Sequence, residues 1–248
     1  MEAIDWEAGP EQAALPAQAV HVWRASLGQP AWVVERLAGL LSARERQRAE
    51  RIRIAERRES YVTAQAMLRI ILARYTGVAP EQIVFATNAF GKPYLPAQDH
   101  RAPLRFNHTD SGDWSLVALS VDREVGVDLE KTIPREGFER IVARYFAEDE
   151  KAAFFALPPE ERLSAFYYGW TAKEAFLKAK GVGLTYSLRK FSVSLRPDQP
   201  PGLVGYPDDP AEVRRWSFRR FVPFTEAVAA LVVAGDMPFA VNYFDLMM

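Results

Sequence analysis

The stretch Val125-Gly126-Val127-Asp128-Leu129-Glu130 decides how the rest of this sequence is interpreted. Its apolar side chains alternate with Gly126, Asp128 and Glu130, which is typical of a short β-strand. The alternation places Asp128 and Glu130 on one face, with their side chains roughly 7 Å apart. Two such carboxylates repel each other unless a divalent cation such as Mg²⁺ lies between them, and Gly126 leaves room for a ligand on the same face. The alternative is an edge strand with a solvated acidic face.

The composition of the chain sets limits on its class. It has 248 residues, of which 49% are hydrophobic and 25% charged, enough to bury a core in one large domain or two small ones. The net charge of -1 gives no reason to expect a nucleic-acid partner. The absence of cysteine excludes disulfides, zinc–thiolate sites and thiol catalysis, and the small number of histidines argues against a histidine-rich metal site.

Targeting and membrane signals are also missing from the sequence. It contains no run of about 18 apolar residues, and its N-terminus lacks the basic flank and apolar core of a signal peptide. We therefore expect a cytoplasmic monomer that binds neither a membrane nor nucleic acid.

Hydrophobic periodicity predicts two halves with a similar order of elements. The expected helices are 32–41, 43–58, 60–75, 138–146, 148–155 and 160–179, and the expected strands are 20–25, 83–86, 114–120, 125–130, 191–195, 216–222 and 227–233. We predict an α+β fold of two similar lobes related by pseudo-twofold symmetry, each a small, mostly antiparallel sheet packed with helices. The N-terminal lobe is 1–121, with a loose tail over 1–19, and the C-terminal lobe is 122–248. The active site is expected at the seam between the lobes.

The second informative stretch runs from Trp170 to Gly181 and is helical in pattern. Glu174 and Lys178 are i,i+4 neighbours on one face of this helix. They form either an ordinary surface ion pair, worth about 0.3–0.5 kcal/mol, or part of a site. In the second case Glu174 is a third metal ligand or a base, and Lys178 contacts a phosphate. Three carboxylates with lysines nearby are what a Mg²⁺–diphosphate site requires.

Two further segments carry charge or polarity. The helix expected over 43–58 is rich in arginine, and its glutamates offset the positive charge only in part. It is either a solvated helix with i,i+4 ion pairs or a landing site for phosphate groups or an acidic partner. Residues 107–113 are interpreted as a dense polar turn, and Gly91-Lys92-Pro93 lies in a turn that presents a lysine.

Together the two stretches resemble the signature motifs of the 4′-phosphopantetheinyl transferases. Val-Gly-Val-Asp-Leu-Glu at 125–130 precedes Trp-Thr-Ala-Lys-Glu-Ala-Phe-Leu-Lys at 170–178. The resemblance extends through Gly91-Lys92-Pro93 and Phe106-Asn107, and covers residues 40 to 195. The length is similar to that of the longer, single-chain, two-lobed class of the surfactin-synthetase-activating type.

The resemblance implies a specific reaction. Enzymes of this family bind coenzyme A between their lobes, with Mg²⁺ (or alternatively Mn²⁺) on its diphosphate. They transfer the 4′-phosphopantetheine arm to a serine of an apo acyl or peptidyl carrier protein and release 3′,5′-ADP. By motif position, Asp128, Glu130 and Glu174 would be the metal ligands, Glu174 the base and Lys178 a catalytic contact to the diphosphate. Further coenzyme A contacts would be Arg48, Thr63, Lys92, His108 and Thr109.

One segment departs from the family pattern. The family turn reads Phe-Asn-x-Ser-His-Ser or Thr, whereas this chain has Asn107-His108-Thr109-Asp110-Ser111 after Phe106. Without a gap, Asp110 takes the position of the family histidine, where a carboxylate beside a phosphate is repulsive. We therefore expect a local shift that brings His108 to the phosphate, with Thr109 giving a hydroxyl and Asp110 turned outward.

Three alternatives of other classes stay open. The chain could be a non-catalytic coenzyme A or carrier-protein binding module, which need not keep all three carboxylates. It could be another Mg²⁺-dependent phosphoryl-transfer enzyme, although neither GxxxxGK[ST] nor GxGxxG occurs in the sequence. It could also be a structural protein whose charges are all solvated.

Overall fold

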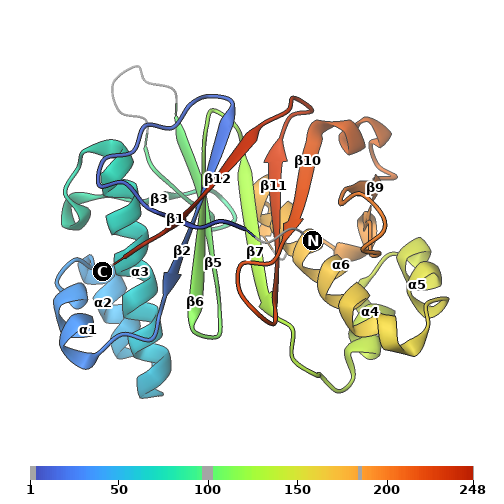
Figure 1. Ribbon diagram of the computed structural model, residues 1–248, viewed down its shortest axis with the longest axis horizontal. Helices are drawn as coiled ribbons and strands as arrows, with labels where there is room; N and C mark the ends of the chain where they lie inside the picture. Colours follow the sequence, from blue (N-terminus) through green and yellow to red (C-terminus); the bar gives the residue numbers. More distant parts are fainter. Residues whose placement is uncertain (1–3, 97–102, 184–185, 248) are drawn as a thin grey trace.

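Two β-sheets lie face to face at the centre of the computed structural model, which describes residues 4–96, 103–183 and 186–247. Helices cover the outer face of each sheet (Figure 1). The inner faces meet in one apolar cluster, to which Val20 and Val22 contribute from one sheet and Val125 and Val127 from the other. The predicted mixed α+β class is confirmed.

The larger sheet has the strand order β1-β12-β2-β6-β5. Its strands are β1 (Glu7–Ala8), β2 (Ala19–Ser26), β5 (Leu104–Ser111), β6 (Trp114–Val121) and β12 (Ala240–Asp245). β2, β6 and β5 are antiparallel neighbours, whereas β12 is parallel to β2. Because β12 comes from the end of the chain, the second half completes the sheet of the first half.

The smaller sheet is antiparallel, with the order β10-β11-β7. Its strands are β7 (Val125–Lys131), β10 (Trp216–Phe221) and β11 (Ala227–Ala234). The strand predicted over 125–130 is confirmed, and Leu129 joins its valines in the core between the sheets. Because side chains alternate along a strand, Asp128 is turned to the opposite side, toward the helix that carries Lys178. Two short pairs complete the strands: β3 (Ala86–Thr87) with β4 (Pro93–Tyr94), and β8 (Ser192–Val193) with β9 (Leu203–Gly205).

Three helices lie on each outer side (Figure 1). The larger sheet is covered by α1 (Ala31–Ala38), α2 (Ala43–Glu50) and α3 (Ala55–Thr76), and the smaller sheet by α4 (Phe138–Tyr145), α5 (Glu148–Phe155) and α6 (Pro159–Lys180). α6 ends where Gly181 adopts the left-handed conformation, with φ 69°, that favours glycine. Over the part of the chain that the structure describes, no helix is long and apolar enough to cross a membrane.

Several predicted elements are wrong in their extent, and of the strand expected over 83–86 only Ala86 lies in β3. The arginine-rich helix expected over 43–58 is broken, because α2 ends at Glu50 and α3 begins at Ala55. The break lets α2 fold back, so that Glu45 forms a 2.8 Å ion pair with Arg69, a residue that would lie roughly 36 Å away along one continuous helix. The polar turn expected over 107–113 is also wrong, since β5 continues to Ser111.

The tail and the symmetry also differ from expectation. Residues 4–19 are not a loose tail, because β1 pairs with β12 and the ring of Trp6 packs edge-on against Tyr243. Pseudo-twofold symmetry is not confirmed, since one sheet contains β12 from the other half and the two sheets differ in size. The division into 1–121 and 122–248 stays a prediction.

Gly126 sets the distance between β7 and α6. A Cβ atom at this position would lie 2.1 Å from the carbonyl oxygen of Ala175 and 2.4 Å from the backbone nitrogen of Ala179. Gly126 therefore makes room for a helix backbone, and not for a ligand as the sequence suggested. The close approach holds the face of α6 that bears Glu174 and Lys178 directly over β7.

We expect Gly126→Ala to lower the free energy of unfolding by about 1–3 kcal/mol or more. This is the usual cost of overpacking, and the opposing atoms are backbone atoms that cannot move aside easily. The measurement is the free energy of unfolding in urea. Gly28→Ala is the control, since a Cβ there meets nothing within 4 Å. Equal stability of the two variants would contradict the close packing of β7 on α6.

Candidate functional site

The seam between the two sheets runs along β5 and β7, where side chains replace backbone pairing. The Oδ1 atom of Asn107 accepts a 2.9 Å hydrogen bond from the backbone nitrogen of Val127. Two residues further, the hydroxyl of Thr109 donates to Oδ1 of Asp128 at 3.2 Å. The hydroxyl of Ser111 accepts from the backbone nitrogen of Lys131 at 3.2 Å. Alternate side chains of β5 thus hold β7, which explains why a polar segment is a strand.

Asp128 and Lys178 form the centre of this seam. Nζ of Lys178 lies 2.6 Å from Oδ1 of Asp128 and donates to Oγ1 of Thr109 at 3.0 Å. Asp128 is only 5% exposed, and its Oδ2 atom is buried without a hydrogen-bond partner. The solvated acidic face is therefore excluded for Asp128. Lys178 of α6 pairs with Asp128 of the neighbouring strand β7, rather than forming a surface pair with Glu174 along its own helix.

The other two predicted carboxylates lie close enough to Asp128 to feel its charge. Burial and then the charge of Asp128 together raise the pKa of Glu130 to about 7, against the opposing effects of Arg135, Lys178 and a hydrogen bond from Trp170. Burial and then the charge of Asp128 raise the pKa of Glu174. Burial also raises the pKa of Asp128, opposed by Lys178. All three carboxyl groups therefore have raised pKa values. A site of this kind lacks positive charge and would be stabilised by a cation.

The oxygen atoms of the three carboxylates are the kind of ligand that a divalent cation prefers, but the three side chains are not yet arranged around one metal position. Across residues 4–96, 103–183 and 186–247, no three His, Cys, Asp or Glu side chains are already arranged around one metal position. The unpartnered Oδ2 atom of Asp128 nevertheless offers a free hard oxygen, and a cation would relieve the repulsion by which Asp128 raises the pKa values of Glu130 and Glu174. Asp128, Glu130 and Glu174 are thus a suitable donor set.

His108 precedes Thr109 on β5, and Arg48 lies on α2. Burial lowers the pKa of His108, and the charges that act on it are those of Asp110, Lys178 and Arg48. The Nδ1 atom of His108 is buried without a partner. Arg48, on α2, lies over the ring of Tyr61 at 5.3 Å. His108 is therefore a buried imidazole on which the charges of both Lys178 and Arg48 act.

Within the described residues, neither Thr63 nor Lys92 forms a hydrogen bond to the side chains of Asp128, Thr109 or Lys178. Thr63 is fully buried within α3, and its hydroxyl also lacks a partner. Lys92 forms a 2.8 Å ion pair with Glu124 and donates to the backbone oxygens of Val125 and Ala179. Burial lowers its pKa. Lys92 thus joins β4, the start of β7 and the end of α6.

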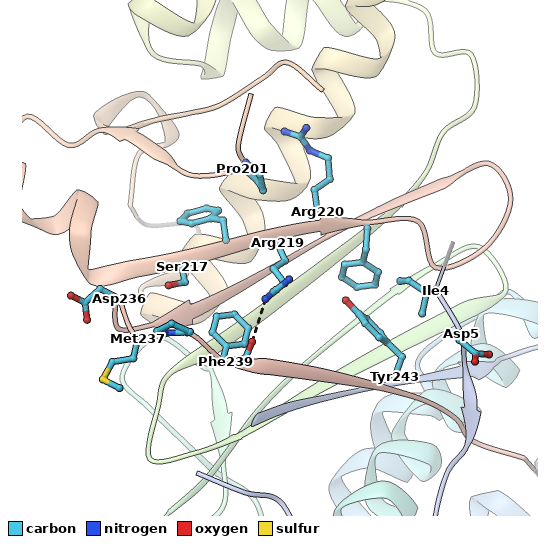
Figure 2. A pocket seen from close by; sticks show the side chains of 13 residues that line it. Ile4, Asp5, Pro201, Ser217, Arg219, Arg220, Asp236, Met237, Phe239 and Tyr243 are labelled. Atoms are coloured by element: carbon cyan, nitrogen blue, oxygen red, sulfur yellow. Dashed lines mark hydrogen bonds between the residues drawn. The ribbon is translucent and has the colours of Figure 1, made fainter. Parts of the chain in front are cut away.

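A cavity of about 650 Å³ lies along the outer edge of β10, and none of the predicted site residues lines it. Figure 2 shows Arg219 donating to the carbonyl oxygen of Phe239 beside Tyr243. Arg220 stacks on Tyr168 at 4.1 Å and donates to two backbone carbonyls. Because these cations already have partners and no predicted carboxylate lines the cavity, the candidate site is the seam.

Sequence reasoning missed several residues of the seam. Asn107 was noted only as part of a motif, and its role of fixing β7 depends on β5 extending past it. Trp170, the first residue of the second motif, supports Glu130. Arg105 and Glu124 face each other at 3.4 Å. No periodicity identifies these two, because their proximity results from the folding of two distant segments.

Comparison with known proteins assigns both halves of the chain to one family. Residues 124–232 match the 4′-phosphopantetheinyl transferase superfamily, and residues 21–122 match the family described as 4′-phosphopantetheinyl transferase, N-terminal. The chain is 35% identical over 230 residues to 4′-phosphopantetheinyl transferase HetI of Nostoc sp., which covers 93% of this chain and 94% of that protein. It is 30% identical over 164 residues to 4′-phosphopantetheinyl transferase Sfp of Bacillus subtilis, covering 66% of this chain and 70% of that protein.

Among solved structures, the holo-[acyl-carrier-protein] synthase of Thermotoga maritima aligns with 46% of this chain and 64% of its own, at 26% identity and a TM-score of 0.36.

The raised pKa of Glu130 predicts a pH-dependent stability in the absence of divalent cations. A carboxyl whose pKa rises from 4.5 to about 7 on folding stabilises the fold below pH 4.5, and this contribution is lost as the pH rises through 7. The melting temperature should therefore fall between pH 5 and pH 8, by roughly 2–6 °C from Glu130 after allowance for solvent screening. Glu130→Gln should flatten this part of the profile.

Thermal melts in a chelating buffer measure this effect. The exposed Glu160, on α6, serves as the control through Glu160→Gln. The interpretation of Glu130 is refuted if both variants keep the full pH dependence of the wild type.

Proposed function

This chain belongs to the 4′-phosphopantetheinyl transferase superfamily, and we propose that it transfers the 4′-phosphopantetheine arm of coenzyme A to a serine hydroxyl of an apo carrier protein. The carrier is an acyl or a peptidyl carrier protein, and the second product is 3′,5′-ADP. The observation that carries the proposal is the seam cluster, in which Asp128 joins Thr109 and Lys178 beside Glu130 and Glu174. It combines acids for a metal with a cation for phosphate.

The proposed reaction is a phosphoryl transfer. The serine oxygen of the carrier attacks the phosphorus that bears the pantetheine arm, and a new phosphorus–oxygen bond forms. The bond from this phosphorus to the bridging oxygen breaks, and the electron pair leaves with 3′,5′-ADP. The carboxylate of Glu174 accepts the serine proton, since burial and Asp128 have raised its proton affinity.

Asp128, Glu130 and Glu174 would hold Mg²⁺ or Mn²⁺ in this reaction. When bound, the cation supplies charge neutralisation on the diphosphate oxygens. Lys178 already touches Asp128 and Thr109, so its ammonium is positioned at the boundary between the acids and the β5 side chains. We assign it to the diphosphate. Its pairing with Asp128 keeps it in place before the ligand arrives.

The nucleotide end of coenzyme A is assigned to the region of His108 and Thr63, on the side of β5 that packs against α3. Thr63 and His108 each have a buried polar atom without a partner, which is unfavourable unless a ligand satisfies it. Arg48 adds a positive charge near His108. We therefore propose Arg48, Thr63, His108 and Thr109 as coenzyme A contacts, and Lys92 as a contact at the far end of the seam.

The direct test of the proposed function is the mass of an apo carrier protein after incubation with the enzyme, coenzyme A and Mg²⁺. A gain of one phosphopantetheine is expected, and a chelator should abolish it. An unchanged mass with tight coenzyme A binding would instead select a non-catalytic binding module. An unchanged mass with no binding would remove the proposed function altogether.

Glu174→Gln should lower turnover by at least about 100-fold, the usual effect of losing a general base, while the KM for coenzyme A changes much less. The substitution keeps the shape of the side chain and removes its charge. Glu160→Gln on the same helix is the control and should leave both constants unchanged. If Glu174→Gln raises KM as much as it lowers kcat, Glu174 only holds the metal.

The altered β5 segment gives a separate prediction. His108→Ala should raise the KM for coenzyme A several-fold, since the unpartnered imidazole is the side chain that needs a ligand. Asp110→Ala should leave that KM within about twofold, because a carboxylate beside a phosphate contributes no attraction. Steady-state kinetics with coenzyme A and dephospho-coenzyme A measure both. The opposite order of effects would return Asp110 to the position of the family histidine.

A further inference from the structure

The cavity of about 650 Å³ lies at the edge of the molecule opposite to the seam. In the smaller sheet the strand order is β10-β11-β7, so β10 and the seam strand β7 are its two edges. The cavity opens between β10 and β12, which belong to different sheets. Because no residue assigned to the metal, the base or coenzyme A lines this cavity, its side chains have no part in the proposed transfer.

One wall of the cavity is the apolar core between the two sheets. Phe221 and Phe239 line the cavity and are only 4% and 8% exposed, as buried members of that core. Ile4 and Tyr243 also line it and pack against the same core, with the ring centroid of Tyr243 5.4 Å from that of Phe221. A ligand in the cavity would therefore bury apolar atoms against the core of the protein.

Arg219 brings a positive charge to this wall. Ser217, Arg219 and Phe221 occupy alternate positions of β10, so their side chains leave the strand on the face that meets β12. Arg219 lies over the ring of Phe239 at 5.3 Å and donates from Nη2 to the carbonyl oxygen of the same residue at 3.2 Å. A guanidinium has five N–H donors, and within residues 4–96, 103–183 and 186–247 Arg219 forms no further hydrogen bond and no ion pair. Its Nε and Nη1 atoms are therefore available to an anion.

The hydroxyl of Tyr243 is a second free donor beside Arg219. Figure 2 shows the hydroxyl end of Tyr243 on the side of its ring that faces Arg219. The charge of Arg219 opposes the rise that burial causes in the pKa of Tyr243, so the guanidinium and the phenol are close enough to interact. Across the part of the chain that the structure describes, this hydroxyl has no hydrogen-bond partner. A guanidinium and an O–H group that converge in this way suit the two oxygens of a carboxylate.

The other charged side chains of the cavity favour a singly charged ligand. Arg220 is engaged by Tyr168 and by two backbone carbonyls, so it offers little to a ligand. Asp5 and Asp236 lie at opposite ends of the cavity, on either side of Arg219 (Figure 2). Two arginines and two aspartates therefore line the cavity, and their formal charges cancel. A multiply charged phosphate gains nothing from such a lining, whereas a monoanion can pair with Arg219 alone.

We propose that this cavity binds a small organic acid, with its carboxylate on Arg219 and Tyr243 and its apolar body on Phe221 and Phe239. The volume of about 650 Å³ is in the range typical of pockets for small organic ligands. Aliphatic and aromatic acids share the required chemistry. The site is separate from the seam, and the proposal goes beyond the transfer reaction without depending on it.

Arg219 has one alternative role, which the same variant tests. A charged side chain on an edge strand prevents the strand from pairing with another chain. That role requires neither the hydroxyl of Tyr243 nor an apolar wall. If it is the only role, Arg219→Gln self-associates in sedimentation and binds an organic acid as the wild type does, which contradicts the proposal.

Titrations with octanoate and 4-phenylbutyrate, followed by NMR of the ligand at fixed ionic strength, test the site and distinguish an aliphatic from an aromatic acid. The wild type is expected to bind at least one of them with a Kd of about 5 mM or lower, as is typical of ligands of this size. 1-Octanol should bind at least about 10-fold more weakly than octanoate, because it forms no charge-assisted hydrogen bond. If neither acid shows saturable binding, or if 1-octanol binds as well as octanoate, the proposal is overturned.

Three variants locate the carboxylate. Arg219→Gln should raise the Kd of the acid roughly 10–100-fold and Tyr243→Phe roughly 2–10-fold, the effects of losing a charge-assisted and a neutral hydrogen bond. Arg214→Gln is the control, since Arg214 is exposed and lies outside the cavity lining. Thermal melts check that each variant is folded. An unchanged Kd in Arg219→Gln, or an equal loss in Arg214→Gln, refutes the assigned contact.

Coenzyme A separates this inference from the proposed function. Saturating coenzyme A should leave the Kd of the acid unchanged, and Arg219→Gln should modify a carrier at the wild-type rate, because β11 lies between β10 and the seam strand β7. Displacement of the acid by coenzyme A overturns the inference, since it would place the acid in the seam. A protein that binds the acid but modifies no carrier refutes the proposed function and supports the acid site.

Discussion

The close packing of β7 on α6 is the constraint on which the rest of the site depends. Gly126 permits the backbones to approach, and two residues later Asp128 meets Lys178 of the helix at 2.6 Å. A larger residue at Gly126 would separate the elements that bring acid, base and cation together. The first half then completes the seam, because β5 fixes β7 through Asn107 and reaches Asp128 through Thr109. The second half of the chain therefore supplies the carboxylates and Lys178, and the first half supplies the β5 side chains that hold them in place.

The sequence predicted those features that depend on local patterns. Alternation located β7, and the two motifs named Asp128, Glu130 and Glu174 as candidate site residues. It could not predict the extent of β5, since Asn107 and Thr109 look like turn residues until their partners on β7 are known. Nor could it predict β12 in the sheet of the first half, because no local pattern specifies a neighbour so far away in the chain.

The charges of the seam favour a positively charged ligand at its carboxylate cluster and a negatively charged ligand at its lysine and arginine side chains. Burial raises the pKa values of Asp128, Glu130 and Glu174, and the charge of Asp128 adds to the rise at Glu130 and Glu174. Lys178 only partly compensates them. Further along the seam, Glu124 pairs with both Lys92 and Arg105. A metal–diphosphate complex would neutralise the acidic end, in agreement with the proposed phosphoryl transfer.

The central claim is that the seam carboxylates take up a divalent cation in place of protons. The most direct measurement is calorimetric titration of Mg²⁺ at pH 7 in two buffers with different heats of ionisation, for the wild type and Asp128→Asn. Because the pKa of Glu130 is about 7, the wild type should release at least about half a proton for each Mg²⁺ bound, and the variant should lose binding. Mg²⁺ binding without proton release, or equal binding by Asp128→Asn, would contradict this account.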